Sequence, residues 1–168
     1  MAAISILLYP EVFQHYSYGV SYFGSVQLTF IPYYFGFGTT IILTVLVAWR
    51  LRPCNKTLST FFYTFAACMT GVAATSYSLS HAVYATHWGC AIALTVCILA
   101  AIYWLIKHGG LQRLDYILIV LVVGTVVVSA LPFVNSIPVV KVYIPRELIV
   151  FTGALWLLGR AALRVCKG

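Results

Sequence analysis

Five long stretches of the sequence are almost entirely apolar, and most of the charged residues gather in the short segments between them. A helix needs about 20 apolar residues to cross the hydrocarbon core of a bilayer, and these stretches approach or reach that length. Backbone polar groups in lipid must bond within the protein, so each stretch is predicted to be a helix. The predicted spans are residues 28–49, 58–80, 89–106, 116–134 and 145–163.

The pattern predicts an all-α fold, namely a polytopic transmembrane helical bundle of about five spans that covers residues 28–168. The strands of a β-barrel would alternate apolar and polar residues, whereas these stretches are apolar on all sides. Residues 1–27 differ, because tyrosine and phenylalanine crowd this segment. Such rings favour the membrane–water boundary, so the segment is predicted to be interfacial or re-entrant, with a poor sixth span as the alternative.

Composition agrees with the membrane class. Hydrophobic residues make up 62% of the chain and charged residues only 8%, whereas a soluble domain carries about 25% charged residues. The formal net charge is +7, with Glu11, Asp115 and Glu147 as the acids. The bases lie in short loops beside apolar stretches, which is typical of membrane orientation and of contact with anionic head groups. This placement argues against nucleic-acid binding, and membrane lipids are the predicted partners.

The distribution of bases predicts the orientation of the chain. Most of the bases lie in residues 50–57, 107–115 and 160–168, and five spans place these three segments on one side. Basic loops favour the cytoplasmic side, so the N terminus is predicted outside and the C terminus in the cytoplasm. The glycosylation sequon at Asn55 falls in a predicted cytoplasmic loop and is therefore predicted to be unused. A glycan there would reverse the orientation.

Small residues recur at helical spacing along one face of the second predicted span. Such residues let two helix backbones approach closely in lipid, where no hydrophobic drive joins helices. Two interpretations remain open: a packing seam within the bundle, or a seam toward a second copy or a partner subunit. The seam consists of Ala67, Gly71, Ala74 and Ser78.

Aromatic and histidine side chains cluster at the predicted end of the second span. They are candidates for a pocket that holds a lipid, a quinone or another hydrophobic molecule, with an interfacial belt as the simpler interpretation. Haem bound by one of these histidines is a further alternative, but no metal-ligand motif accompanies it, so no cofactor and no metal site are predicted. The cluster consists of His81, Tyr84, His87 and Trp88.

Charged residues near the helix ends have structural interpretations. Asp115 and Glu147 open the last two spans, where a carboxylate suits the positive end of the helix dipole. Arg160 and Arg164 share one face near the end of the last span, where they suit the helix C terminus and anionic lipid.

Three functions remain as hypotheses, and none assigns a catalytic residue. The first is a non-catalytic membrane subunit, assembly factor or structural component whose partners are other membrane subunits or a second copy. Its basis is that the middles of the spans lack the ionisable residues that mark pumps and carriers. The second is an enzyme or redox subunit acting on a hydrophobic substrate, and the third is a channel or carrier. The path of a channel would follow the hydroxyls of Thr70, Ser76, Ser78 and Ser80.

Overall fold

The computed structural model describes residues 27–75, 81–108, 111–135 and 143–165, and these residues form an all-α bundle. The predicted N-terminal segment lies outside the described residues except for Gln27. The helices are α2 (Gln27–Leu51), α3 (Lys56–Ala74), α4 (His81–His108), α5 (Arg113–Asn135) and α6 (Tyr143–Val165).

Four of these helices are long and apolar enough to cross a membrane. The corresponding segments are Thr29–Leu51, Lys56–Ala74, Val83–His108 and Glu147–Val165. The remaining helix, α5, is 23 residues long and covers the predicted fourth span. The predicted class, a helical membrane protein, is therefore supported by the fold.

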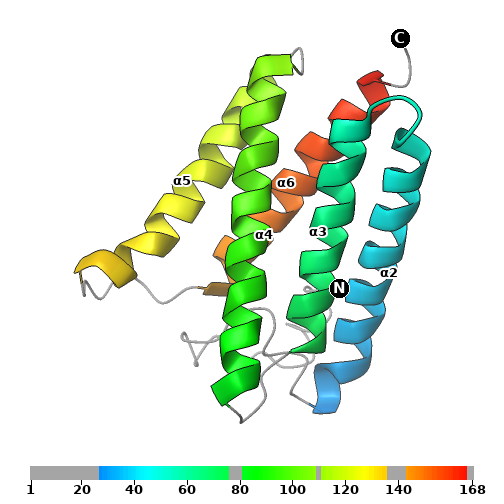
Figure 1. The fold of residues 1–168 in the computed structure, drawn as a ribbon. Helices are drawn as coiled ribbons and strands as arrows, with labels where there is room; N and C mark the ends of the chain where they lie inside the picture. Colours follow the sequence, from blue (N-terminus) through cyan, green and yellow to red (C-terminus); the bar gives the residue numbers. More distant parts are fainter. Residues whose placement is uncertain (1–26, 76–80, 109–110, 136–142, 166–168) are drawn as a thin grey trace.

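The helices form two groups that α4 connects (Figure 1). In the first group α2 packs on α3 and α3 on α4, whereas in the second α5 packs on α6. Smaller contacts of α4 with α6 and α5 join the groups, and α5 diverges from α4 away from their connection. The best-buried large side chains come from α3, α4 and α5, and they are Phe65, Leu58, Leu94, Ile98, Leu105 and Val122.

The up-and-down order of the helices gathers basic side chains at one end of the bundle. This end holds the α2–α3 loop, the α4–α5 connection and the last turns of α6 (Figure 1). Among the described side chains, all seven lysines and arginines lie here, and Asp115 is the only acid beside them. We call this region the basic end; its bases are Arg50, Arg52, Lys56, Lys107, Arg113, Arg160 and Arg164.

The boundary between α3 and α4 differs from the predicted one. The second helix was predicted to reach residue 80 and the third to start at residue 89, but α3 ends at Ala74 and α4 begins at His81. Residues 81–88 are less apolar than the middle of a span, yet they contain no proline or glycine that would stop a helix. The aromatic and histidine residues therefore lie at the start of α4, not at the end of the preceding helix.

Candidate functional site

Part of the predicted hydrophobic pocket forms a small aromatic pair on α4. The ring centroids of Tyr84 and Trp88 are 6.2 Å apart, with the planes inclined at 68°. Tyr84 is about half exposed, with 49% of its surface accessible. The side chain of His81 lies outside the described residues. Two aromatic rings near a helix end suit a membrane–water boundary as well as a ligand contact, so the pocket stays a prediction.

His87 turns toward the neighbouring helix α3. Its Nδ1 lies 3.3 Å from the Thr75 hydroxyl, and the backbone of Val72 and of Thr75 is also within hydrogen-bonding reach of the ring. The last carbonyls of a helix have no partner within that helix, and a histidine can satisfy them. The structure thus gives His87 a capping contact with the end of α3, away from the Tyr84–Trp88 pair.

The described residues of the predicted small-residue seam share one side of α3, at the edge of its contact with α4. Gly71 faces α4, where a Cβ atom on residue 71 would overlap the Cys90 side chain. Ala67 and Ala74 are instead exposed, whereas Ser78 lies outside the described residues. Among the seam residues that the structure describes, Gly71 alone packs closely against α4.

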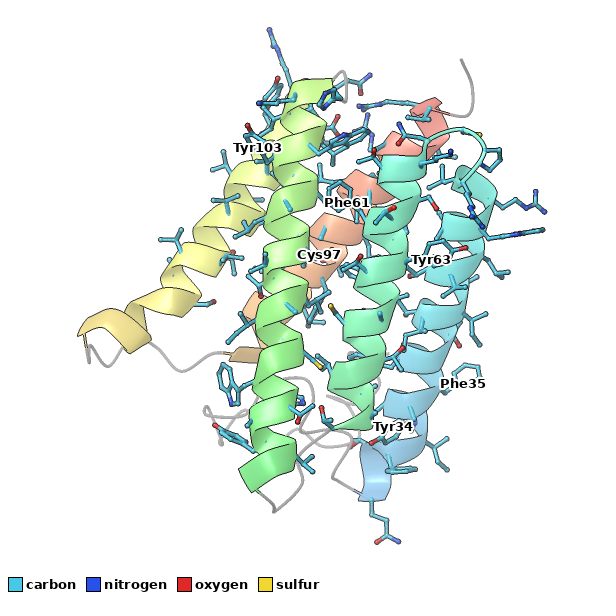
Figure 2. All side chains as sticks on the ribbon, viewed as in Figure 1. Tyr34, Phe35, Phe61, Tyr63, Cys97 and Tyr103 are labelled. Carbon is cyan, nitrogen blue, oxygen red and sulfur yellow. The ribbon has the colours of Figure 1, made fainter. Side chains whose placement is uncertain are left out.

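The exposed side of α3 is rich in small and hydroxyl-bearing residues. Their spacing of three and four residues places them along one stripe of the helix. The Thr60 and Thr70 hydroxyls donate to the carbonyls of Lys56 and Ala66 one turn earlier. We call this stripe the outer face of α3; it consists of Thr60, Tyr63, Thr64, Ala67, Thr70 and Ala74, of which Tyr63 is labelled in Figure 2.

Thiols lie along the contact between α3 and α4. The Cys97 thiol is 3.7 Å from the Phe61 carbonyl, and Figure 2 labels both residues where the two helices face each other. Cys68 and Cys90 are half-buried and unbridged. Within the described parts of the chain, no three metal-ligating side chains come together.

One buried tyrosine hydroxyl finds no hydrogen-bond partner among the described residues. Tyr33 of α2 is only 3% exposed, and its ring packs on Phe37 with centroids 4.6 Å apart. Thr44 and Ser59 are also buried, but their hydroxyls donate to the carbonyls of Thr40 and Ala48, each at 2.7 Å. The bond from Ser59 joins α3 to α2.

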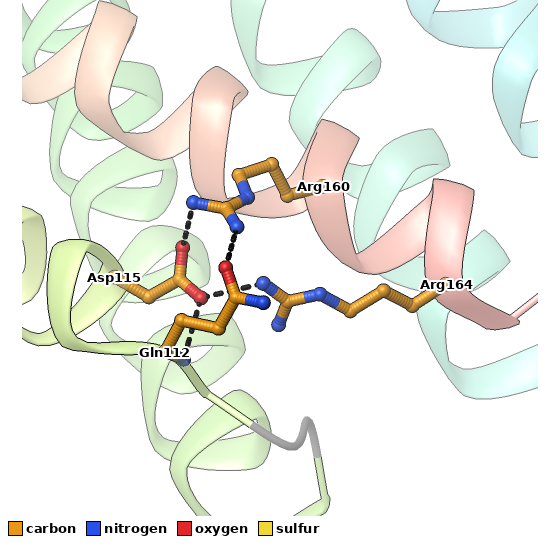
Figure 3. Close-up of polar contacts among 4 residues, drawn as sticks. All are labelled: Gln112, Asp115, Arg160 and Arg164. Carbon is orange, nitrogen blue, oxygen red and sulfur yellow. Dashed lines mark hydrogen bonds and ion pairs between the residues drawn. The ribbon is translucent and has the colours of Figure 1, made fainter.

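The densest polar contact joins α5 to α6 at the basic end (Figure 3). Asp115 Oδ1 lies 3.0 Å from Arg160 Nη1, and Asp115 Oδ2 lies 2.7 Å from Arg164 Nη2. The backbone N–H of Gln112 donates to Asp115 Oδ2 at 2.9 Å, and Arg160 Nη2 donates to the Gln112 side-chain oxygen. We call these four residues the Asp115 cluster.

Asp115 is the buried centre of this cluster. Its side chain is 1% exposed, whereas the Arg160 and Arg164 side chains are 25% and 29% exposed. Burial by itself raises the pKa of the Asp115 carboxyl, but the Gln112 N–H and the two guanidinium groups outweigh it, and the pKa falls below its ordinary value of 3.8. Asp115 is therefore ionised at neutral pH.

The capping role predicted for Asp115 is confirmed, but its ion pairs were not predicted. An acid in the first turn that accepts the N–H of the residue before the helix is half of a capping box, and the Gln112–Asp115 bond has this form. The signal for the ion pairs was the spacing of Arg160 and Arg164, one turn apart at the end of a helix antiparallel to α5.

Aromatic side chains accompany the bases at the same end. Lys107 Nζ lies 4.6 Å from the centroid of the Tyr103 ring, and the His108 ring stacks on Trp104 at 5.3 Å. Rings and cations at one end of a bundle are characteristic of a membrane–water interface.

Comparison with known proteins gave no relative: the sequence matches no protein-family model, no curated protein and no solved structure.

Proposed function

We propose that the chain is a non-catalytic membrane subunit that binds another membrane helix through the outer face of α3. The observation that carries this proposal is the composition of that face. On it Ala67 and Ala74 lie among threonines with Tyr63 as the one large side chain, whereas α4 exposes Ile92, Val96 and Tyr103 between its own small residues Ala93 and Ala100. Lipid contacts suit bulky apolar residues, and helix–helix contacts in lipid suit small and hydroxyl-bearing ones.

The partners of the buried polar groups support a non-catalytic role. Thr44 and Ser59 bond to backbone carbonyls, and Asp115 bonds to Gln112 and two arginines. The Thr44 bond lies within α2, the Ser59 bond joins two helices, and Asp115 serves a helix start and a helix contact, all of which are structural tasks. An enzyme or redox subunit that uses Tyr84 and Trp88 remains the alternative, and a channel or carrier is less well supported because the Thr70 hydroxyl bonds back to its own helix.

The proposal includes an orientation. The seven described bases at one end of the bundle support a cytoplasmic basic end, because basic segments beside spans are retained on that side. This orientation places the C terminus in the cytoplasm.

The test is to enlarge the small residues of the outer face and to measure association. Ala67→Leu and Ala74→Leu would keep the face apolar but hold another helix at a distance. Overpacking costs about 1–3 kcal/mol, so association should weaken by about fivefold to about 150-fold. Ala100→Leu is the matched control, because Ala100 is exposed on α4 between Val96 and Tyr103, bulky residues that suit contact with lipid.

Association is measured by cross-linking in native membranes, followed by mass determination in mild detergent. We expect wild type and Ala100→Leu to form the same complex, either with a second copy or with a distinct chain, and both α3 variants to lose it. A wild-type chain that is monomeric in both measurements would refute the proposal, as would an equal loss in Ala100→Leu.

A further inference from the structure

Counted over its four residues, the Asp115 cluster has a net charge of +1. Arg160 and Arg164 contribute two charges, and Asp115 contributes one negative charge. The acid is enclosed, but about a quarter of each arginine side chain remains accessible. Because the carboxylate is enclosed, an anion that approaches the cluster meets the arginine side chains and not Asp115.

The surroundings of the cluster are both basic and apolar. Lys107 and Arg113 lie at the same end of the bundle, so the local field favours a negatively charged group. Beside these bases, Leu114 and Leu163 are 49% and 64% exposed. A ligand that satisfies both features has an anionic head and an apolar body.

We propose that Arg160 and Arg164 bind the phosphate group of an anionic phospholipid, whose acyl chains lie along the exposed apolar residues of α5 and α6. Guanidinium groups present fixed forks of N–H donors that match phosphate oxygens. Asp115 acts as a positioning residue, because its two oxygens hold the two arginines one helical turn apart at the same surface. This inference does not depend on the proposed subunit function.

The net charge of the cluster explains why the lipid is anionic and not zwitterionic. A choline or ethanolamine head group brings its own cation, which the bases of this end repel and which an accessible carboxylate would have to balance. Asp115 is 1% exposed and unavailable for this purpose. A lipid with a net negative charge instead balances the surplus positive charge.

The test uses native mass spectrometry of the full chain in detergent, with phosphatidylglycerol or phosphatidylcholine added. Wild type should retain phosphatidylglycerol about tenfold better, which corresponds to about one charge-assisted hydrogen bond. Arg160→Gln leaves the Asp115–Arg164 pair intact but removes the surplus charge, so this preference should disappear. Arg113→Gln removes one charge from the same end outside the cluster and should change the preference less than twofold.

A variant that restores the charge distinguishes a loss of lipid binding from a loss of folding. Arg160→Gln combined with Asp115→Asn returns the cluster to a single positive charge and should recover part of the preference, because Arg164 then meets the phosphate alone. Equal retention of both lipids by wild type would overturn the inference, even if a variant fails to fold. An equal loss in Arg160→Gln and Arg113→Gln would also overturn it, as would full displacement of the lipid by millimolar inorganic phosphate, since the ligand would then be a free anion.

Discussion

Replacement of Asp115 should lower the free energy of unfolding, and the size of this loss can be worked out from the contacts of Asp115. Asp115→Ala removes the helix cap on Gln112, which contributes about 1 kcal/mol. It also removes two ion pairs whose arginines are 25% and 29% exposed, so each contributes at most about 1 kcal/mol. The expected loss is about 2–3 kcal/mol. Asp115→Asn keeps an oxygen that can accept the Gln112 N–H and should lose only about 1–2 kcal/mol.

The effect of this replacement should depend on pH. Folding holds the pKa of Asp115 below its ordinary value of 3.8, so its stabilising contribution is complete above that pH and is lost as the pH falls through the lower folded value. The difference in unfolding free energy between wild type and Asp115→Asn should therefore be constant near neutral pH and shrink below about pH 4.

The assay is unfolding of the detergent-solubilised chain by increasing sodium dodecyl sulfate, followed by circular dichroism. Ser59→Ala at neutral pH provides a reference on the other side of the bundle, because the Ser59 hydroxyl forms a buried bond to the Ala48 carbonyl and does not titrate. Equal stability of Asp115→Asn and wild type at pH 7 would refute the stabilising contribution of the Asp115 carboxylate. A difference that persists undiminished at pH 3 would refute its electrostatic part.

Two further substitutions test packing and polar burial by the same assay. Gly153→Ala should destabilise by about 1–3 kcal/mol, because the added Cβ would overlap Val122 of α5. Gly159 has open space around it, so Gly159→Ala should be neutral or stabilising. Equal effects of the two substitutions would contradict the close approach of Gly153 to Val122. Tyr33→Phe should be neutral or stabilising by about 1 kcal/mol, because it removes a buried hydroxyl that has no partner in the described part of the chain. A clear loss of stability would show that the hydroxyl is bound.

The C-terminal ends of several helices were predictable from the sequence because basic residues mark them. The first span was predicted at residues 28–49 and forms a helix over Gln27–Leu51, and the last was predicted at 145–163 and forms one over Tyr143–Val165. Basic residues follow the apolar stretch in both cases. The end of α3 was not predictable in this way, because residues 75–88 carry neither charges nor strong breakers.

Contacts between helices were the part that the sequence did not show. The pairing of Asp115 with Arg160 and Arg164 requires α5 and α6 to be neighbours in a particular rotation, which periodicity along one helix does not specify. His87 illustrates the same limit: its residue type suggested a ligand, but its position beside the last turn of α3 gives it a capping contact. Gly71 was recognised as a packing residue, yet its partner Cys90 was not.

The Asp115 cluster and Gly153 together explain how α5 keeps its place in the bundle. Apolar side chains in lipid gain little by exchanging acyl chains for another helix, so contacts between oriented polar groups or closely fitting surfaces must set the position of each helix. For α5, the described contacts of this kind are the ion pairs at the basic end and the close approach of Val122 to Gly153. Both contacts join α5 to α6, whereas α5 diverges from α4 beyond the α4–α5 connection. We therefore expect α5 to follow α6 in any rearrangement of the bundle.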